Sequence, residues 1–152
     1  MYVWAIVALH SVSDAAFRAK KAVVVRATGC TEQEFLAMFR RAPCFVFMSA
    51  ELLRRKMDFL MATVGCGADY IVRNPMLLTL SLSKRMVPRC RVIETLRSKG
   101  VDIGKERQVT IVRRSEAMFL ERYILRYREV APELLKVYPP DNRKGSSHSQ
   151  GD

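Results

Sequence analysis

Apolar residues recur at steps of three and four along much of the chain, the spacing that places them on one side of an α-helix. The first clear stripe consists of Phe35, Met38, Phe39 and Ala42. A second stripe consists of Leu53, Met57, Leu60, Met61 and Val64. These patterns predict an all-α chain built from amphipathic helices.

Capping residues and helix breakers mark where these helices begin and end. Thr31 opens a capping box, in which its side chain and that of a glutamate three residues later each bond the other residue's backbone amide. Pro43 ends the first helix because it disfavours helical angles in the residue before it. Ser49 caps the second helix, and Gly65 and Gly67 are predicted to end it by permitting a left-handed turn.

The chain also contains an internal repeat. The stretch Arg41–Ser49 recurs 32 residues later as Arg73–Ser81, with the same arginine, proline and serine and with three matching apolar positions. Gly29, Gly65 and Gly100 follow a similar period, with spacings of 36 and 35 residues. Self-similarity at this period indicates a repeat architecture. Each unit of about 35 residues would hold a short helix, a proline break and a long capped helix.

The later units depart from this scheme in ways that change the prediction. The second long helix begins at Ser81 or Ser83, and Pro88 lies inside it, where a lost hydrogen bond should kink the axis. The third unit lacks a proline at its junction, and Ser115 is the expected cap. Residues 109–112 all have β-branched side chains, and their propensity alone would favour a strand. The frame of the repeat favours a helix there.

One helix pair cannot bury its own apolar stripe, so about three units should stack into a right- or left-handed α-solenoid. Residues 1–138 form this helical-repeat domain, and residues 139–152, rich in serine, glycine and proline, are expected to be a disordered polar tail. The apolar stretch 2–9 is too short to span a membrane and lacks the basic segment of a secretory signal. It favours a packed helix over a targeting segment.

The charge of the chain points to a polyanionic partner. The formal net charge is +11 and the isoelectric point is near 10, which favours nucleic acid or an anionic membrane surface. Thirteen basic and five acidic residues lie between positions 84 and 128, a net charge of +8. The candidate nucleic-acid-binding residues are Arg54, Arg55, Arg85, Arg89, Arg91, Lys105, Arg107, Arg113 and Arg114. Arg85 and Arg89 are four residues apart and should share one helix face. The alternative is that such a run is only a solvated face.

Aromatic residues offer a second possible nucleic-acid contact. Phe119, Tyr123 and Tyr127 lie four residues apart and could stack on bases, as aromatic residues do in single-strand binders. The same spacing is typical of a buried helix stripe, and we favour the core interpretation.

Catalytic and metal chemistry have little support. There are only two histidines, and the four cysteines, Cys30, Cys44, Cys66 and Cys90, form no C-x-x-C pair. We expect them to be buried free thiols. No phosphate-loop, nucleophile-elbow or zinc-protease motif occurs. The sequence therefore predicts a protein that is not an enzyme and that has no metal, cofactor, small-molecule substrate or membrane partner.

Two segments resemble the mitochondrial transcription termination factor (mTERF) family, in its plant form. The segment Asn74–Arg89 combines a proline, two leucines, a serine-leucine pair and a basic stretch that ends in proline-arginine. The segment Phe119–Tyr138 is similar to the close of the family's C-terminal region. The resemblance covers residues 35–138. Members of the family usually have more than the three or so repeats found here. The chain therefore resembles a truncated C-terminal portion of a family member.

The resemblance implies a helical-repeat protein that binds double-stranded DNA in a mitochondrion or chloroplast. It implies a role in transcription termination or regulation, and we expect a monomer. Because some plant members are associated with RNA processing, an organellar RNA-binding factor in splicing or RNA stability is an alternative. A protein-interaction solenoid or an inert truncated copy is an alternative of a different class. No clear transit peptide precedes the repeats.

Overall fold

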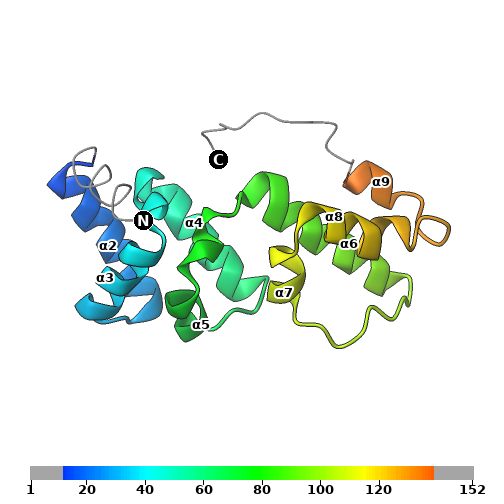
Figure 1. Cartoon of the computed structure of the whole chain (residues 1–152), viewed down its shortest axis with the longest axis horizontal. Helices are drawn as coiled ribbons and strands as arrows, with labels where there is room; N and C mark the ends of the chain where they lie inside the picture. The colour runs from blue at the N-terminus through cyan, green and yellow to red at the C-terminus, as the bar shows by residue number, and fades with distance from the viewer. Residues whose placement is uncertain (1–11, 139–152) are drawn as a thin grey trace. The chain divides into compact units, whose positions relative to one another are not determined.

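The computed structural model describes residues 12–138, and the predictions for residues 2–9 and 139–152 lie outside this part. No strand occurs among the described residues, and the prediction of an all-α helical-repeat chain is confirmed (Figure 1). The α-helices are α2 (Asp14–Thr28), α3 (Glu32–Arg41), α4 (Ala50–Ala62), α5 (Ala68–Arg73), α6 (Val87–Ser98), α7 (Gln108–Arg113), α8 (Glu116–Phe119) and α9 (Leu134–Val137). Between them lie the 3-10 helices η1 (Pro43–Phe47) and η2 (Pro75–Thr79) and the π-helical turns η3 (Leu82–Met86) and η4 (Leu120–Leu125).

The predicted helix starts are confirmed by their hydrogen bonds. The Thr31 backbone amide donates to the Glu34 carboxylate at 2.7 Å, and the Thr31 hydroxyl accepts from the Glu34 amide at 3.3 Å, which completes the capping box. Ser49 accepts from the amide three residues later at 3.1 Å. Ser115 does the same at 3.4 Å. Each serine satisfies one of the amides that the first turn of a helix leaves unpaired.

Pro43 and Pro75 each separate a short helix from a longer helical segment, as the repeat predicts. The residues before them, Ala42 and Asn74, have non-helical backbone angles (φ −144° and ψ 65°, φ −126° and ψ 57°). Each proline then opens a 3-10 helix, η1 or η2, which the sequence did not predict. Because proline fixes φ near the helical value and needs no hydrogen-bond acceptor, it suits a first helical position.

The glycines differ from the prediction at one position. Gly29, Gly65 and Gly100 follow the long helices with φ of 70°, 73° and 72°, the left-handed region that favours glycine. Gly67 instead has φ −67° and ψ 153° and is the residue before α5. The prediction that Gly67 ends a helix through a left-handed turn is therefore wrong, since its extended backbone is open to any residue.

Pro88 lies in the first turn of α6. The kink expected at this residue stays a prediction, since proline and a π-helical turn each bend helix axes. The π-helical turn η3 precedes it and carries the chain from Ser81 into the helix. The helix predicted for residues 109–112 is confirmed, because α7 covers them despite their β-branched side chains.

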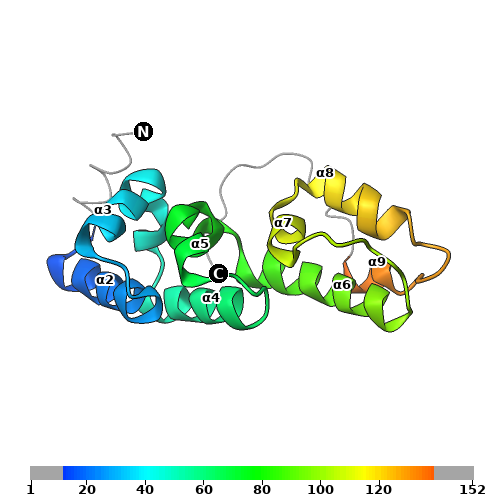
Figure 2. The same cartoon turned by 90° about the horizontal axis from the view of Figure 1, so that it is seen from below.

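The chain divides at the boundary between Ser81 and Leu82 into two compact units, each longer than one repeat and each with its own core. The first unit ends at Ser81 and the second begins at Leu82. In the first unit α2 packs against α4, and the rings of Phe17, Phe35 and Phe45 meet edge to face. In the second unit α6 packs against α7 and α9 (Figure 2). This second core consists of Val92, Ile93, Leu96, Ile111, Phe119, Tyr123, Ile124, Ala131, Leu134 and Tyr138.

A basic residue recurs at one position of each long helical segment. In the described residues, Ser13, Ser49 and Ser115 are each followed after seven residues by a cation, and Ser81 is followed by one after eight. These four cations are Lys20, Lys56, Arg89 and Arg122. The longer spacing after Ser81 coincides with η3, and a π-helical turn accommodates one extra residue. The sequence predictions missed this position.

Two of these cations bind the main chain of the repeat that follows them. The Lys56 ammonium is buried and donates to the Leu78 carbonyl at 3.1 Å. Arg89 is completely buried and donates to the carbonyls of Val112 at 2.9 Å and Arg114 at 2.5 Å. These acceptors lie beyond the short helices α5 and α7 or in their last turns, where carbonyls lack helical partners and cations are favoured.

Candidate nucleic-acid interface

The nine candidate residues fall into three groups along the chain. Arg54 and Arg55 are on α4 in the first unit. The second unit holds the other seven, on η3, on α6 and around α7. The exposure of these side chains and their partners differ widely from group to group.

The two candidate arginines on α4 differ in whether an acidic side chain of the protein already pairs with them. Arg54 is exposed but pairs with Glu51 at 2.7 Å and Asp58 at 2.9 Å. The hydrogen bonds that Arg54 donates to the Glu51 carboxylate raise the pKa of its guanidinium. Arg55 is exposed and has no ion pair at 4 Å or less within the described residues. Arg55 is therefore the better candidate for an external anion.

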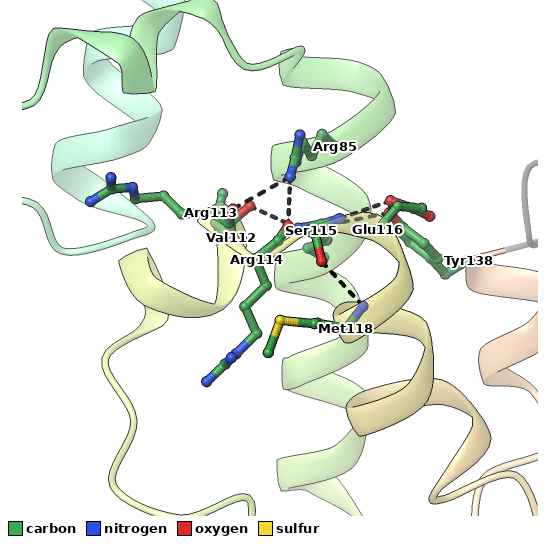
Figure 3. A network of polar contacts seen from close by, with 9 residues as sticks. Arg85, Val112, Arg113, Arg114, Ser115, Glu116, Met118 and Tyr138 are labelled. Atoms are coloured by element: carbon green, nitrogen blue, oxygen red, sulfur yellow. Dashed lines mark hydrogen bonds and ion pairs between the residues drawn. The ribbon is translucent and has the colours of Figure 1, made fainter. Parts of the chain in front are cut away.

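Arg85 is committed to the protein itself. Its guanidinium points toward the junction between α7 and α8 and donates to the carbonyls of Arg113 at 3.4 Å and Arg114 at 2.5 Å (Figure 3). Burial lowers the pKa of Arg85, and the neighbouring charge of Arg89 adds to this effect. The side chains of Arg113 and Arg114 extend away from the junction, so only their carbonyls take part.

Arg89 does not offer an exposed cation, and that prediction is wrong. In addition to its two carbonyl acceptors, its guanidinium donates to the Glu116 carboxylate at 2.8 Å and to the Tyr138 hydroxyl at 3.2 Å. It also lies 4.4 Å from the centre of the Phe119 ring. Arg85 and Arg89 do share a helix face, as predicted, but that face packs against the following repeat. The charge of Arg89 therefore stabilises the second unit.

Four of the five remaining candidates in the second unit are exposed. Arg91 is exposed on α6, and no ion pair to its side chain occurs within the described residues. Lys105 and Arg107 are exposed in the loop that leads into α7, and Arg113 is exposed at the end of α7. Arg114, by contrast, is only 17% exposed and is paired with Glu106. Four of the seven candidates in this unit therefore remain accessible.

Glu106 is the acidic centre of the basic loop, and the sequence predictions missed it. Its side chain is 16% exposed, and its carboxylate accepts from the Tyr123 hydroxyl at 2.6 Å and pairs with Arg114. Arg122 lies 4.0 Å away. Burial acts to raise the pKa of Glu106, but the hydrogen bonds from Tyr123 and Arg114 outweigh it, and the pKa lies below its ordinary value.

The aromatic stripe is part of the core, as favoured from the sequence. Phe119 and Tyr123 are buried, and Tyr127 packs partly buried against the same cluster. Phe119 and Tyr123 therefore present no open ring face of the kind on which bases stack. The spacing of a buried helix stripe explains them.

Other chemistry has no site in the part of the chain that is described. No group of three or more histidine, cysteine, aspartate or glutamate side chains there could hold a metal ion. All four cysteines are free, but Cys44 is exposed, so the expectation of buried thiols holds only for the other three. No described helix has both the length and the apolar character that a membrane crossing requires.

A missed signal in the sequence marks the recurring cation position that includes Lys56 and Arg89. The spacing of seven or eight residues from a serine cap to a cation is visible in the sequence, although it does not tell buried from exposed. For Glu106 no comparable signal exists, since a single carboxylate in a loop has no period.

Comparisons with known proteins agree with the repeat. The model of the mTERF family matches residues 8–120. A curated relative, "Transcription termination factor MTERF15, mitochondrial" of Arabidopsis thaliana, is 26% identical over 132 residues, which cover 82% of this chain and 29% of that protein. The chain thus spans less than a third of the relative's length. No solved structure matches the chain. Since the family model covers well over half of the residues, the chain belongs to the mTERF family.

Proposed function

We propose that this chain binds double-stranded DNA as a monomer and acts in organellar transcription termination or regulation. Family membership supports a nucleic-acid ligand, and the name of the relative supports both the process and an organellar location. The single observation that carries the proposal is the set of exposed cations in the second unit. They are Arg91, Lys105, Arg107 and Arg113.

The chemistry of these cations favours the phosphate backbone as the ligand. Lysine and arginine side chains on a surface release counterions when they neutralise phosphates, and this supplies most sequence-independent affinity. Arg85, Arg89 and Arg114 are buried or partly buried, and Arg54 pairs with two carboxylates, so these four are left out of the proposed contact set. Arg55 on α4 is proposed as a further contact in the first unit.

The buried aromatic stripe favours a duplex over a single strand. Single-strand binders gain about 1–3 kcal/mol for each base stacked on an aromatic side chain. Phe119 and Tyr123 are buried and unable to serve in this way. An organellar RNA role in splicing or stability is the alternative that the same titrations decide.

The first experiment measures affinity for a DNA duplex and for a single-stranded RNA of equal length over a salt series. We expect the duplex to bind more tightly. The variant Lys105→Ala/Arg107→Ala should lower the slope of log K against log salt by about 1.8, at about 0.9 for each phosphate that is no longer neutralised. The matched control Arg18→Ala/Lys21→Ala also removes two positive charges, from α2. Both of these residues have an acidic partner.

The control should therefore lose less affinity than the loop variant. Equal losses in both variants would show that net charge alone drives binding, and tighter binding of RNA would favour the alternative function. Location is tested separately, by imaging the tagged protein together with mitochondrial and chloroplast markers. Signal outside both organelles would contradict the organellar part of the proposal.

A further inference from the structure

The loop between α6 and α7 is fixed to the second unit at several points. Val101 and Ile103 pack against the core cluster. Asp102 closes a small turn, in which its carboxylate accepts from the Gly104 amide at 2.8 Å. Gly104 itself has φ 78°, a left-handed conformation that glycine adopts readily. The loop is therefore ordered up to the point where its basic residues begin.

Glu106 is the last of these attachment points, and it lies between two exposed cations. Its carboxylate turns inward to the Tyr123 hydroxyl, to Arg114 and toward Arg122. Lys105 precedes it and Arg107 follows it, and both side chains are exposed. Arg107 has an extended backbone, with φ −67° and ψ 137°. The inward Glu106 side chain thus ties the backbone between these two exposed residues to the second unit.

We propose that Glu106 is a positioning residue, which holds Lys105 and Arg107 in the arrangement that binds a phosphate backbone. This inference rests on the proposed function. A cation on an ordered loop loses less conformational freedom on binding than one on a loose loop, and this raises affinity. The anchoring residue thus contributes to binding a polyanion although its own charge is negative.

The sign of that contribution makes the proposal testable. Glu106→Gln adds one unit of positive charge, and electrostatic attraction alone would tighten binding to a polyanion. If Glu106 positions the loop, the same change weakens duplex binding by at least about threefold. The matched control is Glu129→Gln, which makes the same charge change at an exposed residue with no ion pair among the described residues. It should bind as tightly as the wild type or more tightly.

A double-mutant cycle separates positioning from a general loss of structure. Removal of the two loop cations in Lys105→Ala/Arg107→Ala should cost the wild type about tenfold in duplex affinity. In the Glu106→Gln background the same removal should cost less than about threefold, because the cations are already misplaced. Additive losses would overturn the proposal, as would tighter binding by Glu106→Gln.

Two further measurements keep the inference testable if Glu106→Gln folds poorly or the wild type binds no duplex. Tyr123→Phe removes one hydrogen bond to Glu106 without a charge change and should weaken duplex binding in the same direction. Hydrogen exchange of the amides of residues 101–107 reports on the anchor without any ligand. Faster exchange confined to this loop in both variants is expected, and unchanged exchange would refute the anchor. A wild type that binds no nucleic acid would overturn the proposed function, whatever the exchange result.

Discussion

Replacement of Arg89 by alanine tests whether a buried cation stabilises the second unit. The guanidinium has four acceptors: two main-chain carbonyls, the Glu116 carboxylate and the Tyr138 hydroxyl. A hydrogen bond to a charged group contributes about 1.5–3 kcal/mol, and removal of one partner of a buried ion pair costs about 3–5 kcal/mol. Because the Glu116 side chain is 48% exposed, water can solvate its carboxylate after the substitution.

We therefore expect the free energy of unfolding to fall by about 3–5 kcal/mol in Arg89→Ala, toward the lower end of that range. Arg89→Lys keeps the charge but loses the planar group that serves four acceptors, and it should cost about half as much. Arg91→Ala is the matched control, because Arg91 is exposed two residues further along the same helix. Its effect should stay within about 0.5 kcal/mol.

Urea unfolding followed by far-ultraviolet circular dichroism measures these differences. A typical small protein has only about 5–15 kcal/mol of stability, so the loss in Arg89→Ala is large enough to resolve. The reasoning is refuted if Arg89→Ala is no less stable than Arg91→Ala. It is also refuted if lysine at position 89 matches the wild type, since the guanidinium geometry would then contribute nothing.

Two further predictions concern stability. Gly65→Ala should lower the free energy of unfolding by about 1–2 kcal/mol, because Gly65 has φ 73° and alanine is strained in this left-handed conformation. An added Cβ would meet no atom within 4 Å, so a steric clash adds nothing to this cost. Gly67→Ala, at φ −67°, should change it little, and equal urea midpoints for the two variants would contradict this. Since the pKa of Glu106 lies below its ordinary value of 4.5 when folded, the carboxylate stabilises the protein above about that pH. This stability is lost as the pH falls through the folded pKa, and Glu106→Gln should flatten the pH dependence of unfolding in that acid range.

The boundaries of the helices could be predicted because local chemistry sets them. Thr31, Ser49 and Ser115 cap helices with their own side chains, and Pro43 breaks one through its own ring. These effects act over a few residues and need no knowledge of the tertiary structure. The repeat of about 35 residues could be found for the same reason, since it consists of such local signals.

The burial of charge could not be predicted. Arg89 and Arg91 look alike in sequence, yet the first is completely buried and the second is exposed. The difference depends on acceptors 23–49 residues away, which no helical period reveals. Glu106 was missed because its partners Tyr123 and Arg114 come from other elements. A count of basic residues therefore overstates the number of cations available to a ligand.

The main-chain acceptors of Lys56 and Arg89 have a consequence for how the repeats diverge. A carbonyl oxygen is present whatever side chain a residue carries, so Leu78 and Val112 can be exchanged for other residues without removing the acceptor. Substitutions in the receiving repeat thus leave the bond intact as long as its backbone keeps its course. Successive repeats can therefore diverge in sequence and still keep this bond. This is consistent with the few identities shared by Arg41–Ser49 and Arg73–Ser81.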